Sequence, residues 1–329
     1  MREKISNSID IREAVERWVD KVYPTKEEFN RVLTSNRKIT IYIGIDPTGP
    51  HLHLGHLTNF LFLKVLQKLG HKVIFLIGDF TAQIGDPTGK DSTRQQLSVA
   101  EIKKNFKTFK SQASKIVSFS GKNAAKVMFN SKWHGKMSFA EAMELASNFT
   151  IQQMIERDMF QVRIKEGKPI GLHEFFYPLV QGYDSVAMNV DAELGGTDQT
   201  FNMLMGRTLM KTYRNKDKFV ITTKLLENPV TGRKLMSKSE GGTINLDDTP
   251  EDVFGKIMAL GDEAMFQVAY LSSEMALDEL ANLKEGVAKR GMNPKDAKLR
   301  IAREVVRTIF GDKIAQKAEE NFTKVFSKK

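Results

Sequence analysis

The chain has 329 residues and a formal net charge of +10, from 50 Lys and Arg against 40 Asp and Glu. It contains no cysteine, which excludes disulfide bonds, thiolate metal sites and a cysteine nucleophile. The start of the chain lacks the apolar segment of a signal peptide, and no apolar run could span a bilayer, so we expect a cytoplasmic protein without membrane contact. The positive charge favours nucleic acid as a partner, and a merely lysine-rich surface is the alternative.

The first 38 residues are predicted to form a helical leader. Their apolar residues recur at helical spacing in two patches, which are separated at Tyr23-Pro24. We expect this leader to pack against the first strand of the next unit, a Rossmann-like α/β catalytic domain with a parallel sheet that spans residues 39–222.

This catalytic domain opens with a predicted strand at 39–45, a helix at 57–69 and a second strand at 72–79. The loop after the first strand holds three histidines within six residues, and the loop after the second strand is rich in Gly, Asp and Pro. Parallel strands end at the same edge of a sheet, so we expect a ligand crevice above these two loops. The helix N-terminus beside it favours an anion.

A helical insertion is predicted at about 124–173, with a short strand near 125–129. Capping boxes mark helix starts in and before it, at Ser98-Glu101, Ser138-Glu141 and Thr150-Gln153. The insertion is rich in Met and Phe. Core packing is the simplest interpretation of these side chains, and an exposed share of them would form a dimer interface.

Two further stretches carry polar residues at informative spacing. Tyr177, Gln181 and Asp184 share one face of a helix whose first turn we expect to contain Pro178. This stripe lacks Lys and Glu, which favours an inward-facing site over a solvated face. The pair Gly195-Gly196 precedes a helix expected from about Asn202, and such glycines allow the backbone to approach a ligand, although Gly-Gly is also an ordinary turn.

After a late strand at 219–223, residues 223–246 form a long loop with Gly, Ser, Lys and Arg. A mobile cationic loop of this kind suits closure over phosphates, and a solvated basic turn is the alternative. Residues 247–329 are predicted to form an all-α domain, with helix starts at Thr249-Pro250 and Asn293-Pro294.

The three histidines could bind a metal by count, but no carboxylate lies in the helical turn after them, so we expect no protein-bound metal. We favour His53 and His56 as donors of hydrogen bonds to phosphate oxygens during nucleotidyl transfer. The cationic complement on the flexible loops consists of Lys90, Arg94, Lys234 and Lys238.

The segment His53-Leu-Gly55-His56 resembles the His-x-Gly-His signature of class I aminoacyl-tRNA synthetases, and Met236-Ser-Lys238-Ser239 resembles their Lys-Met-Ser-Lys-Ser signature. Within the class, the chain is most similar to the tyrosyl-tRNA synthetase family over nearly its whole length. Further segments resemble that family's pattern: Gly44-Ile-Asp46-Pro-Thr48, Gly85-Asp86-Pro-Thr-Gly-Lys90, Tyr177-x-x-x-Gln181-x-x-Asp184 and Gly195-Gly196-Thr-Asp198-Gln199.

The resemblance implies tyrosine activation with ATP, which carries its own Mg²⁺, followed by transfer to tRNA(Tyr) in a homodimer with an anticodon-binding type of helical domain. It implies that Tyr42 and Asp184 hold the phenolic hydroxyl, and that Asp86, Tyr177 and Gln181 hold the ammonium group with Gln199 nearby. The implied ATP residues are Gly44, Asp46, Thr48, His53, Gly55, His56, Gly196, Asp198, Met236 and Lys238. Lys90, Arg94 and Lys238 would stabilise the leaving pyrophosphate.

Two departures from the family pattern are visible. Leu235 stands where the second signature has its first Lys, and the sequence leaves open whether Lys234 replaces it. The family usually continues into a small RNA-binding domain, which we expect this chain to lack. The alternatives are a tryptophan enzyme, a small-molecule nucleotidyltransferase and a non-enzymatic RNA-binding relative. Tyr42 with Asp184 counts against the first, because an indole offers no hydroxyl.

Overall fold

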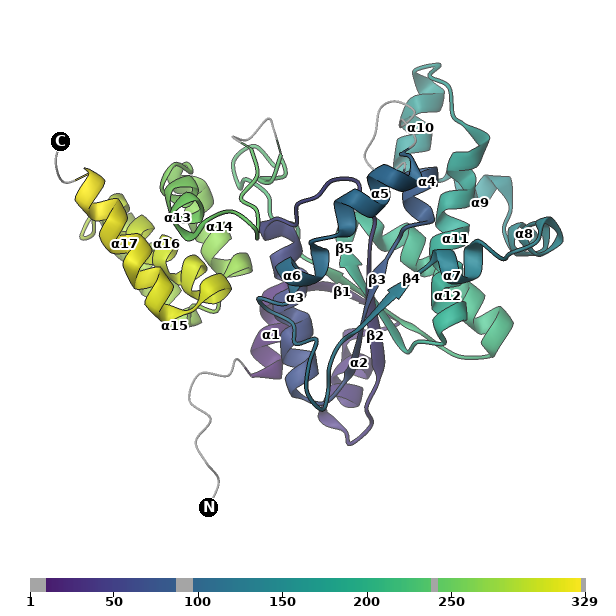
Figure 1. Ribbon diagram of the computed structural model, residues 1–329, viewed down its shortest axis with the longest axis horizontal. Helices are drawn as coiled ribbons and strands as arrows, with labels where there is room; N and C mark the ends of the chain where they lie inside the picture. Colours follow the sequence, from purple (N-terminus) through teal and green to yellow (C-terminus); the bar gives the residue numbers. More distant parts are fainter. Residues whose placement is uncertain (1–9, 87–96, 238–241, 327–329) are drawn as a thin grey trace.

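The computed structural model describes residues 10–86, 97–237 and 242–326 (Figure 1). A central sheet lies between helices α1 and α3 on one side and α11 and α12 on the other, and a purely helical C-terminal part lies beside it. This arrangement confirms the expected fold class, an α/β catalytic part followed by an all-α part.

The sheet has six strands in the order β1-β6-β5-β2-β3-β4. Their bounds are Val19–Tyr23 (β1), Thr40–Ile45 (β2), Lys72–Ile77 (β3), Lys126–Phe129 (β4), Ala192–Gly196 (β5) and Phe219–Thr223 (β6). All neighbours pair in parallel except β1 with β6. The chain builds outward from β2 through β3 to β4 and then returns to the other side of β2. The gap between the carboxyl ends of β2 and β5 is therefore a topological switch point, where ligands bind in such sheets.

The helices of the catalytic part are α1 (Ile11–Trp18), α2 (Lys26–Thr34), α3 (Leu54–Lys68), α4 (Thr81–Ile84), α5 (Val99–Phe106), α6 (Phe109–Ala113), α7 (Ser131–His134), α8 (Phe139–Ala146), α9 (Ile151–Ile155), α10 (Asp158–Lys165), α11 (Leu172–Met188) and α12 (Thr200–Arg214), with a 3₁₀ turn at Thr197–Gln199. The C-terminal helices are α13 (Pro250–Met258), α14 (Asp262–Ser272), α15 (Leu277–Ala288), α16 (Pro294–Phe310) and α17 (Asp312–Phe326).

The local signals in the sequence are confirmed. The expected strands at 39–45, 72–79, 125–129 and 219–223 correspond to β2, β3, β4 and β6. The three capping boxes begin α5, α8 and α9, and in each the hydroxyl accepts from the N–H three residues on. Each satisfies a backbone donor within a few residues, which is why the pattern is readable without tertiary information.

Two expectations are corrected by the structure. The first 38 residues contain a strand as well as helices, because β1 pairs with the edge of β6. The prediction for Pro178 was wrong: it lies inside α11, which begins at Leu172. The helix start is set earlier, where Glu174 accepts from the Gly171 N–H at 2.8 Å and forms an ion pair with Arg163.

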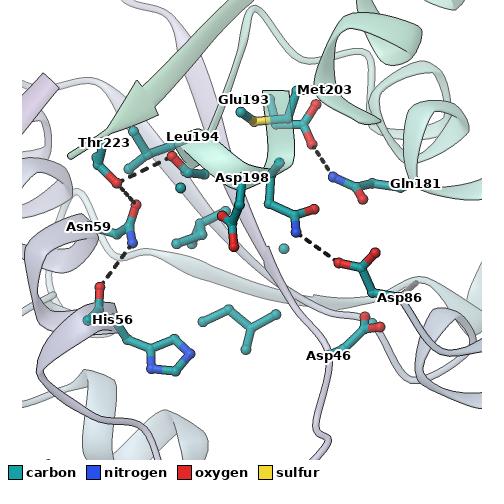
Figure 2. A pocket seen from close by; sticks show the side chains of 18 of the residues that line it. Asp46, His56, Asn59, Asp86, Gln181, Glu193, Leu194, Asp198, Met203 and Thr223 are labelled. Atoms are coloured by element: carbon teal, nitrogen blue, oxygen red, sulfur yellow. Dashed lines mark hydrogen bonds between the residues drawn. The ribbon is translucent and has the colours of Figure 1, made fainter. Parts of the chain in front are cut away.

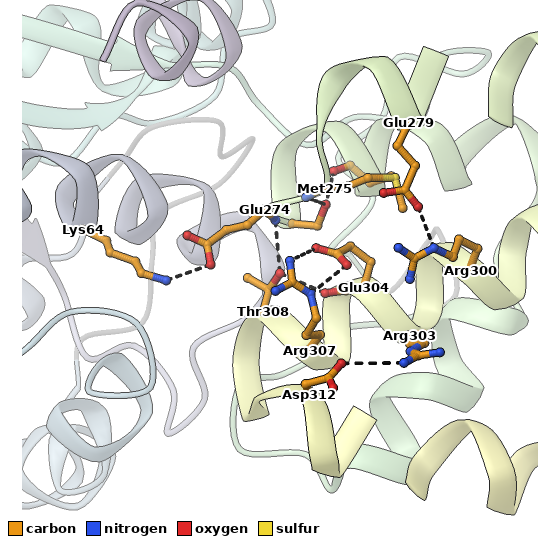
Figure 3. A network of polar contacts seen from close by, with 12 residues as sticks. Lys64, Glu274, Met275, Glu279, Arg300, Arg303, Glu304, Arg307, Thr308 and Asp312 are labelled. Atoms are coloured by element: carbon orange, nitrogen blue, oxygen red, sulfur yellow. Dashed lines mark hydrogen bonds and ion pairs between the residues drawn. The ribbon is translucent and has the colours of Figure 1, made fainter. Parts of the chain in front are cut away.

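Polar contacts join the C-terminal helices to the catalytic part, and Figure 3 shows that of Lys64 with Glu274. Arg17 of α1 is fully buried and donates to the carbonyls of Ala269 and Met275 at 3.0 and 2.7 Å. Lys64 of α3 forms an ion pair of 2.8 Å with Glu274. Helix α3 begins at the histidine loop, so the C-terminal part is attached to the helix that builds the candidate site.

Candidate active site

A cavity of about 390 Å³ opens at the switch point between β2 and β5 (Figure 2). It brings together the following residues proposed from the sequence: Tyr42, Gly44, Asp46, Thr48, His53, Gly55, His56, Asp86, Tyr177, Gln181, Asp184, Gly196, Asp198, Gln199, Lys234 and Met236. Lys90, Arg94 and Lys238 lie outside the described residues. His51 lies apart from the cavity lining, with Nδ1 2.8 Å from Asp247 Oδ2.

The two histidines of the cavity have their ring nitrogens oriented by the backbone. His53 Nδ1 accepts from the Gly55 N–H and His56 Nδ1 accepts from the His53 N–H, both at 3.1 Å. Burial lowers the pKa of His53 to about 4, aided by Lys234, and that of His56 to about 3, aided by His53. Both rings are therefore neutral at pH 7 with the proton on Nε2, so each offers one N–H donor.

One end of the cavity is closed by Asp184, which is almost fully buried. Its Oδ1 accepts from Trp133 Nε1 at 2.8 Å and lies 2.7 Å from His134 Nε2, while Oδ2 accepts from Asn130 Nδ2 at 3.3 Å. Burial raises the pKa of Asp184, and the hydrogen bonds from these partners oppose this change. Because Trp133 and Asn130 both donate to it, Asp184 is oriented as a hydrogen-bond acceptor, and a ligand that can donate suits this position.

Further carboxyl groups face the cavity near Asp184. Asp46 accepts from Thr81 Oγ1 at 2.6 Å and from the Tyr177 hydroxyl at 3.0 Å. Burial raises the pKa of Asp46 to about 7, and the charges of Asp86 and Asp184 add to this effect. Acidic groups this close disfavour one another's ionisation, and a cationic group bound among them would relieve the repulsion.

The Tyr42 hydroxyl is also buried at this end, 3.1 Å from Ser185 Oγ. Burial raises the pKa of Tyr42, and the nearby carboxylates of Glu193 and Asp184 raise it further. Tyr42 therefore remains a neutral phenol that can both donate and accept a hydrogen bond.

The lysine-bearing loop also lines the cavity. Lys234 Nζ lies 2.5 Å from Asp198 Oδ2. The end of this loop, at residues 244–246, pairs with the histidine loop. The Leu54 N–H donates to the Ile244 carbonyl at 3.1 Å, and the Leu246 N–H donates to the Leu52 carbonyl at 2.7 Å. The two signature loops are thus joined by backbone hydrogen bonds.

Several polar residues of the site were missed by the sequence analysis. They are Asn59, Thr81, Asn130, Trp133, His134, Glu193 and Lys218. Glu193 lies in β5, a strand that the sequence analysis did not predict, and a carboxylate buried in a strand requires a partner. The others depend on which elements pack together, and their spacing in the sequence carries no such information.

Within the described ranges, no three or more His, Cys, Asp or Glu side chains are grouped so as to hold a metal ion. Among the same residues, no helix is both long and apolar enough to cross a membrane.

Comparison with known proteins places this site in a family. The family model described as "tRNA synthetases class I (W and Y)" matches residues 34–327. The tyrosine--tRNA ligase of Carboxydothermus hydrogenoformans is 43% identical over 320 residues, which cover 96% of this chain and 77% of that protein. That of Francisella tularensis is 45% identical over 316 residues, with 96% and 78% covered.

Solved structures share the fold. A C-terminally truncated mitochondrial tyrosyl-tRNA synthetase from Aspergillus nidulans superimposes with a TM-score of 0.78 at 22% identity, covering 97% of this chain and 95% of that one. The tyrosyl-tRNA synthetase of Archaeoglobus fulgidus, complexed with L-tyrosine, gives a TM-score of 0.71 at 22% identity, with 94% and 100% covered. The chain belongs to the class I tRNA synthetases of the tryptophan and tyrosine family.

Proposed function

We propose that this protein is a tyrosine--tRNA ligase, which uses ATP to convert L-tyrosine to tyrosyl-adenylate and then transfers the tyrosyl group to tRNA(Tyr). The observation that carries the proposal is the buried Asp184 at the end of the cavity, held by its donors as a hydrogen-bond acceptor. A phenolic hydroxyl can donate to it, whereas the ring edge of phenylalanine leaves it without a partner.

The remaining groups at this end suit an amino acid. Tyr42 and Asp184 hold the phenolic hydroxyl. Asp86, Tyr177 and Gln181 surround the ammonium group, with Gln199 bonded to Asp86 at 2.8 Å. The acidic character of this region favours a cation, and the resemblance to the family assigns the same residues. Asp46 is assigned to the adenylate, and its contact with the Tyr177 hydroxyl supports a second role beside the proposed ammonium site.

The chemistry requires no side-chain nucleophile. The carboxylate oxygen of tyrosine attacks the α-phosphorus of ATP, the bond to the β-phosphate oxygen breaks, and pyrophosphate leaves with its Mg²⁺. His53 and His56 donate from Nε2 to the phosphate oxygens as charge shifts, and as neutral donors they need no change in protonation. Thr48, Gly44, Gly55 and Met236 line the path of ATP.

The nucleoside and the leaving group occupy the other end. Asp198 accepts from the ribose hydroxyls, with Gly196 allowing the close approach. Lys90, Arg94 and Lys238, which lie outside the described residues, are assigned to the pyrophosphate on the resemblance alone. Lys234 is an additional cation at this end, because its ammonium already reaches Asp198.

We also propose a homodimer through the helical insertion. Met154 and Phe160 of this insertion are buried, whereas Phe139 and Ile151 are 81% and 73% exposed. Leu172, at the start of α11, is 75% exposed. Exposed apolar side chains concentrated in one part of a chain are typical of a protein interface.

Amino-acid-dependent ATP–pyrophosphate exchange, run over the twenty amino acids, tests the proposal. We expect exchange with tyrosine alone. Exchange with tryptophan would identify the sister enzyme, and exchange without any amino acid would identify a nucleotidyltransferase. Silence with tyrosine would refute the activity, and charging of tRNA(Tyr) by the same preparation tests the second step.

A further inference from the structure

Lys218 precedes β6 and is fully buried. Its ammonium nitrogen contacts Glu193 Oε2 and lies 2.9 Å from Ser185 Oγ. Burial lowers the pKa of Lys218, and the carboxylate of Glu193 opposes this change. A buried ion pair often stabilises a fold no more than packed apolar side chains of the same volume, so this pair needs a reason other than stability.

Glu193 connects Lys218 to the cavity. Its other oxygen, Oε1, accepts from Gln181 Nε2 at 3.2 Å (Figure 2). A carboxylate can only accept, so Gln181 must turn its N–H₂ group towards Glu193. The amide oxygen of Gln181 then faces the other way, where it accepts from Asn202 Nδ2 at 2.9 Å.

The chain of hydrogen bonds continues from Asn202 through Gln199 to Asp86. Asn202 Nδ2 also donates to Gln199 Oε1 at 3.1 Å, and Gln199 Nε2 donates to Asp86 Oδ2 at 2.8 Å. The N–H₂ group of Asn202 therefore donates to the side-chain oxygens of both Gln181 and Gln199. Its own Oδ1 has no partner among the described residues. An amide that leaves a buried acceptor unpaired is oriented by its neighbours, since the unmade hydrogen bond is unfavourable.

A row of three amides therefore runs between two carboxylates, and a donor must face each end. We propose that Lys218 is a positioning residue for the amino-acid substrate: its ion pair fixes the carboxyl group of Glu193 in place, and so orients the row Gln181, Asn202 and Gln199 that presents Asp86 to the substrate's ammonium group. The proposal rests on the proposed function, which puts an amino acid at this end of the cavity.

Loss of Lys218 removes the donor to Glu193 Oε2 and leaves this buried carboxyl group without its cation. The contact of Glu193 Oε1 with Gln181 is then no longer fixed, and the Gln181 amide can turn over. The N–H₂ groups of Gln181 and Asn202 would then oppose each other, and Gln199 would no longer be fixed against Asp86. The ammonium group of the substrate loses its oriented partner, while Asp184 keeps its contacts with Asn130, Trp133 and His134.

The test compares two ligands that differ only in the ammonium group: L-tyrosine and 3-(4-hydroxyphenyl)propionate. Their Kd values are measured by equilibrium dialysis and competition for the wild type, Lys218→Met and the double variant Lys218→Met/Glu193→Gln. We expect Lys218→Met to weaken tyrosine binding about tenfold, the cost of one lost buried hydrogen bond, with little change for the deamino ligand. The double variant should recover most of the loss, because a neutral amide again accepts from Gln181.

Lys64→Met is the matched control, since it removes the lysine of another Lys–Glu pair at the junction with the C-terminal helices. It should leave both Kd values unchanged. Equal weakening of both ligands by Lys218→Met, or a double variant no better than the single one, would overturn the inference. If Lys218→Met fails to fold, Glu193→Gln alone should still lower the preference for tyrosine over the deamino ligand, because the Lys218 ammonium takes the oxygen of the new amide and leaves its N–H₂ group facing Gln181. An unchanged preference would refute the role. Wild-type protein that binds no tyrosine would instead refute the proposed function.

Discussion

Lys234 Nζ lies 2.5 Å from Asp198 Oδ2, so the loop after β6 is tethered to the residue that we assign to the ribose of ATP. Lys234 stands one position before the place where the family's second signature has its first lysine. The ribose hydroxyls would compete with Lys234 for the oxygens of Asp198. We therefore expect the binding of ATP to draw this ammonium group towards the phosphates.

Lys234→Met should accordingly lower kcat for adenylate formation, by about 10- to 100-fold, and leave KM for ATP unchanged or lower. The lost cation acts in the transition state, whereas in the free protein it competes with ATP for Asp198. ATP–pyrophosphate exchange at varied ATP measures both quantities, with the neighbouring Arg233→Met as control. A rise in KM for ATP at constant kcat would show that Lys234 serves ground-state binding instead.

His53→Ala should slow adenylate formation by about 10²-fold, because one donor to the developing phosphate charge is lost. His53 also caps α3 through Nδ1, so the variant loses about 1 kcal/mol of stability as well. His53→Asn separates the two effects, since Asn is a good cap but does not reach as far. Both variants should bind tyrosine as the wild type does in equilibrium dialysis, and a large loss of tyrosine affinity would contradict the assigned role.

The affinity for tyrosine should depend on pH through Asp46. Because burial raises the pKa of Asp46 to about 7, this carboxyl takes up a proton as the pH falls below 7 and then attracts the ammonium group less. KM for tyrosine should rise towards the acid side with a limiting slope of about tenfold per pH unit. Asp46→Asn should remove this dependence, and a wild-type KM that is flat from about pH 8 to pH 5.5 would contradict it.

The raised pKa of Asp46 also makes the stability of the fold depend on pH. The pKa of Asp46 is higher in the folded protein than in the unfolded chain, so the ionised carboxyl is unfavourable to folding above pH 7, and this cost is relieved as the pH falls towards 4. Urea unfolding of the wild type and Asp46→Asn at both ends of this range should show the variant relatively more stable at the alkaline end.

The junction between the catalytic and C-terminal parts should depend on Arg17. Its guanidinium donates to carbonyls of α14 and the following turn, and Arg17→Met removes all of these hydrogen bonds. We expect a loss of about 3 kcal/mol in the free energy of unfolding, measured by urea titration. Arg12→Met, on an exposed position of the same helix, should change it by less than about 0.5 kcal/mol.

The parts of the fold that could be predicted are those with local causes. Strand β2, the histidine loop and the capped helices can be recognised from a few consecutive residues, because apolar periodicity and capping act at short range. Strand β1 could not be predicted, since its residues Val19 and Val22 fit a helical pattern equally well and only the edge of β6 decides. The prediction that Pro178 lies in the first turn of its helix was wrong for a similar reason, because the start of α11 is set by Glu174 and Arg163.

The site divides in the same way. The residues proposed to bind ligands belong to short motifs, and those that the structure describes line one cavity. The residues that orient them are distant in sequence: His134 and Trp133 reach Asp184 from the insertion, and Lys218 reaches Glu193 from the start of β6. Their roles depend on the packing of separate elements, which no spacing in the sequence specifies.

The central claim is that Asp184 and Tyr42 select for a hydroxyl on the substrate, and the ratio of kcat/KM for tyrosine over phenylalanine in ATP–pyrophosphate exchange tests it most directly. Tyrosyl-tRNA synthetases are themselves the source of the figure of about 10⁵ for such a site, and we expect a ratio of that order. Asp184→Ala should reduce the ratio sharply while leaving KM for ATP little changed. Comparable kcat/KM values for the two amino acids in the wild type would contradict the account.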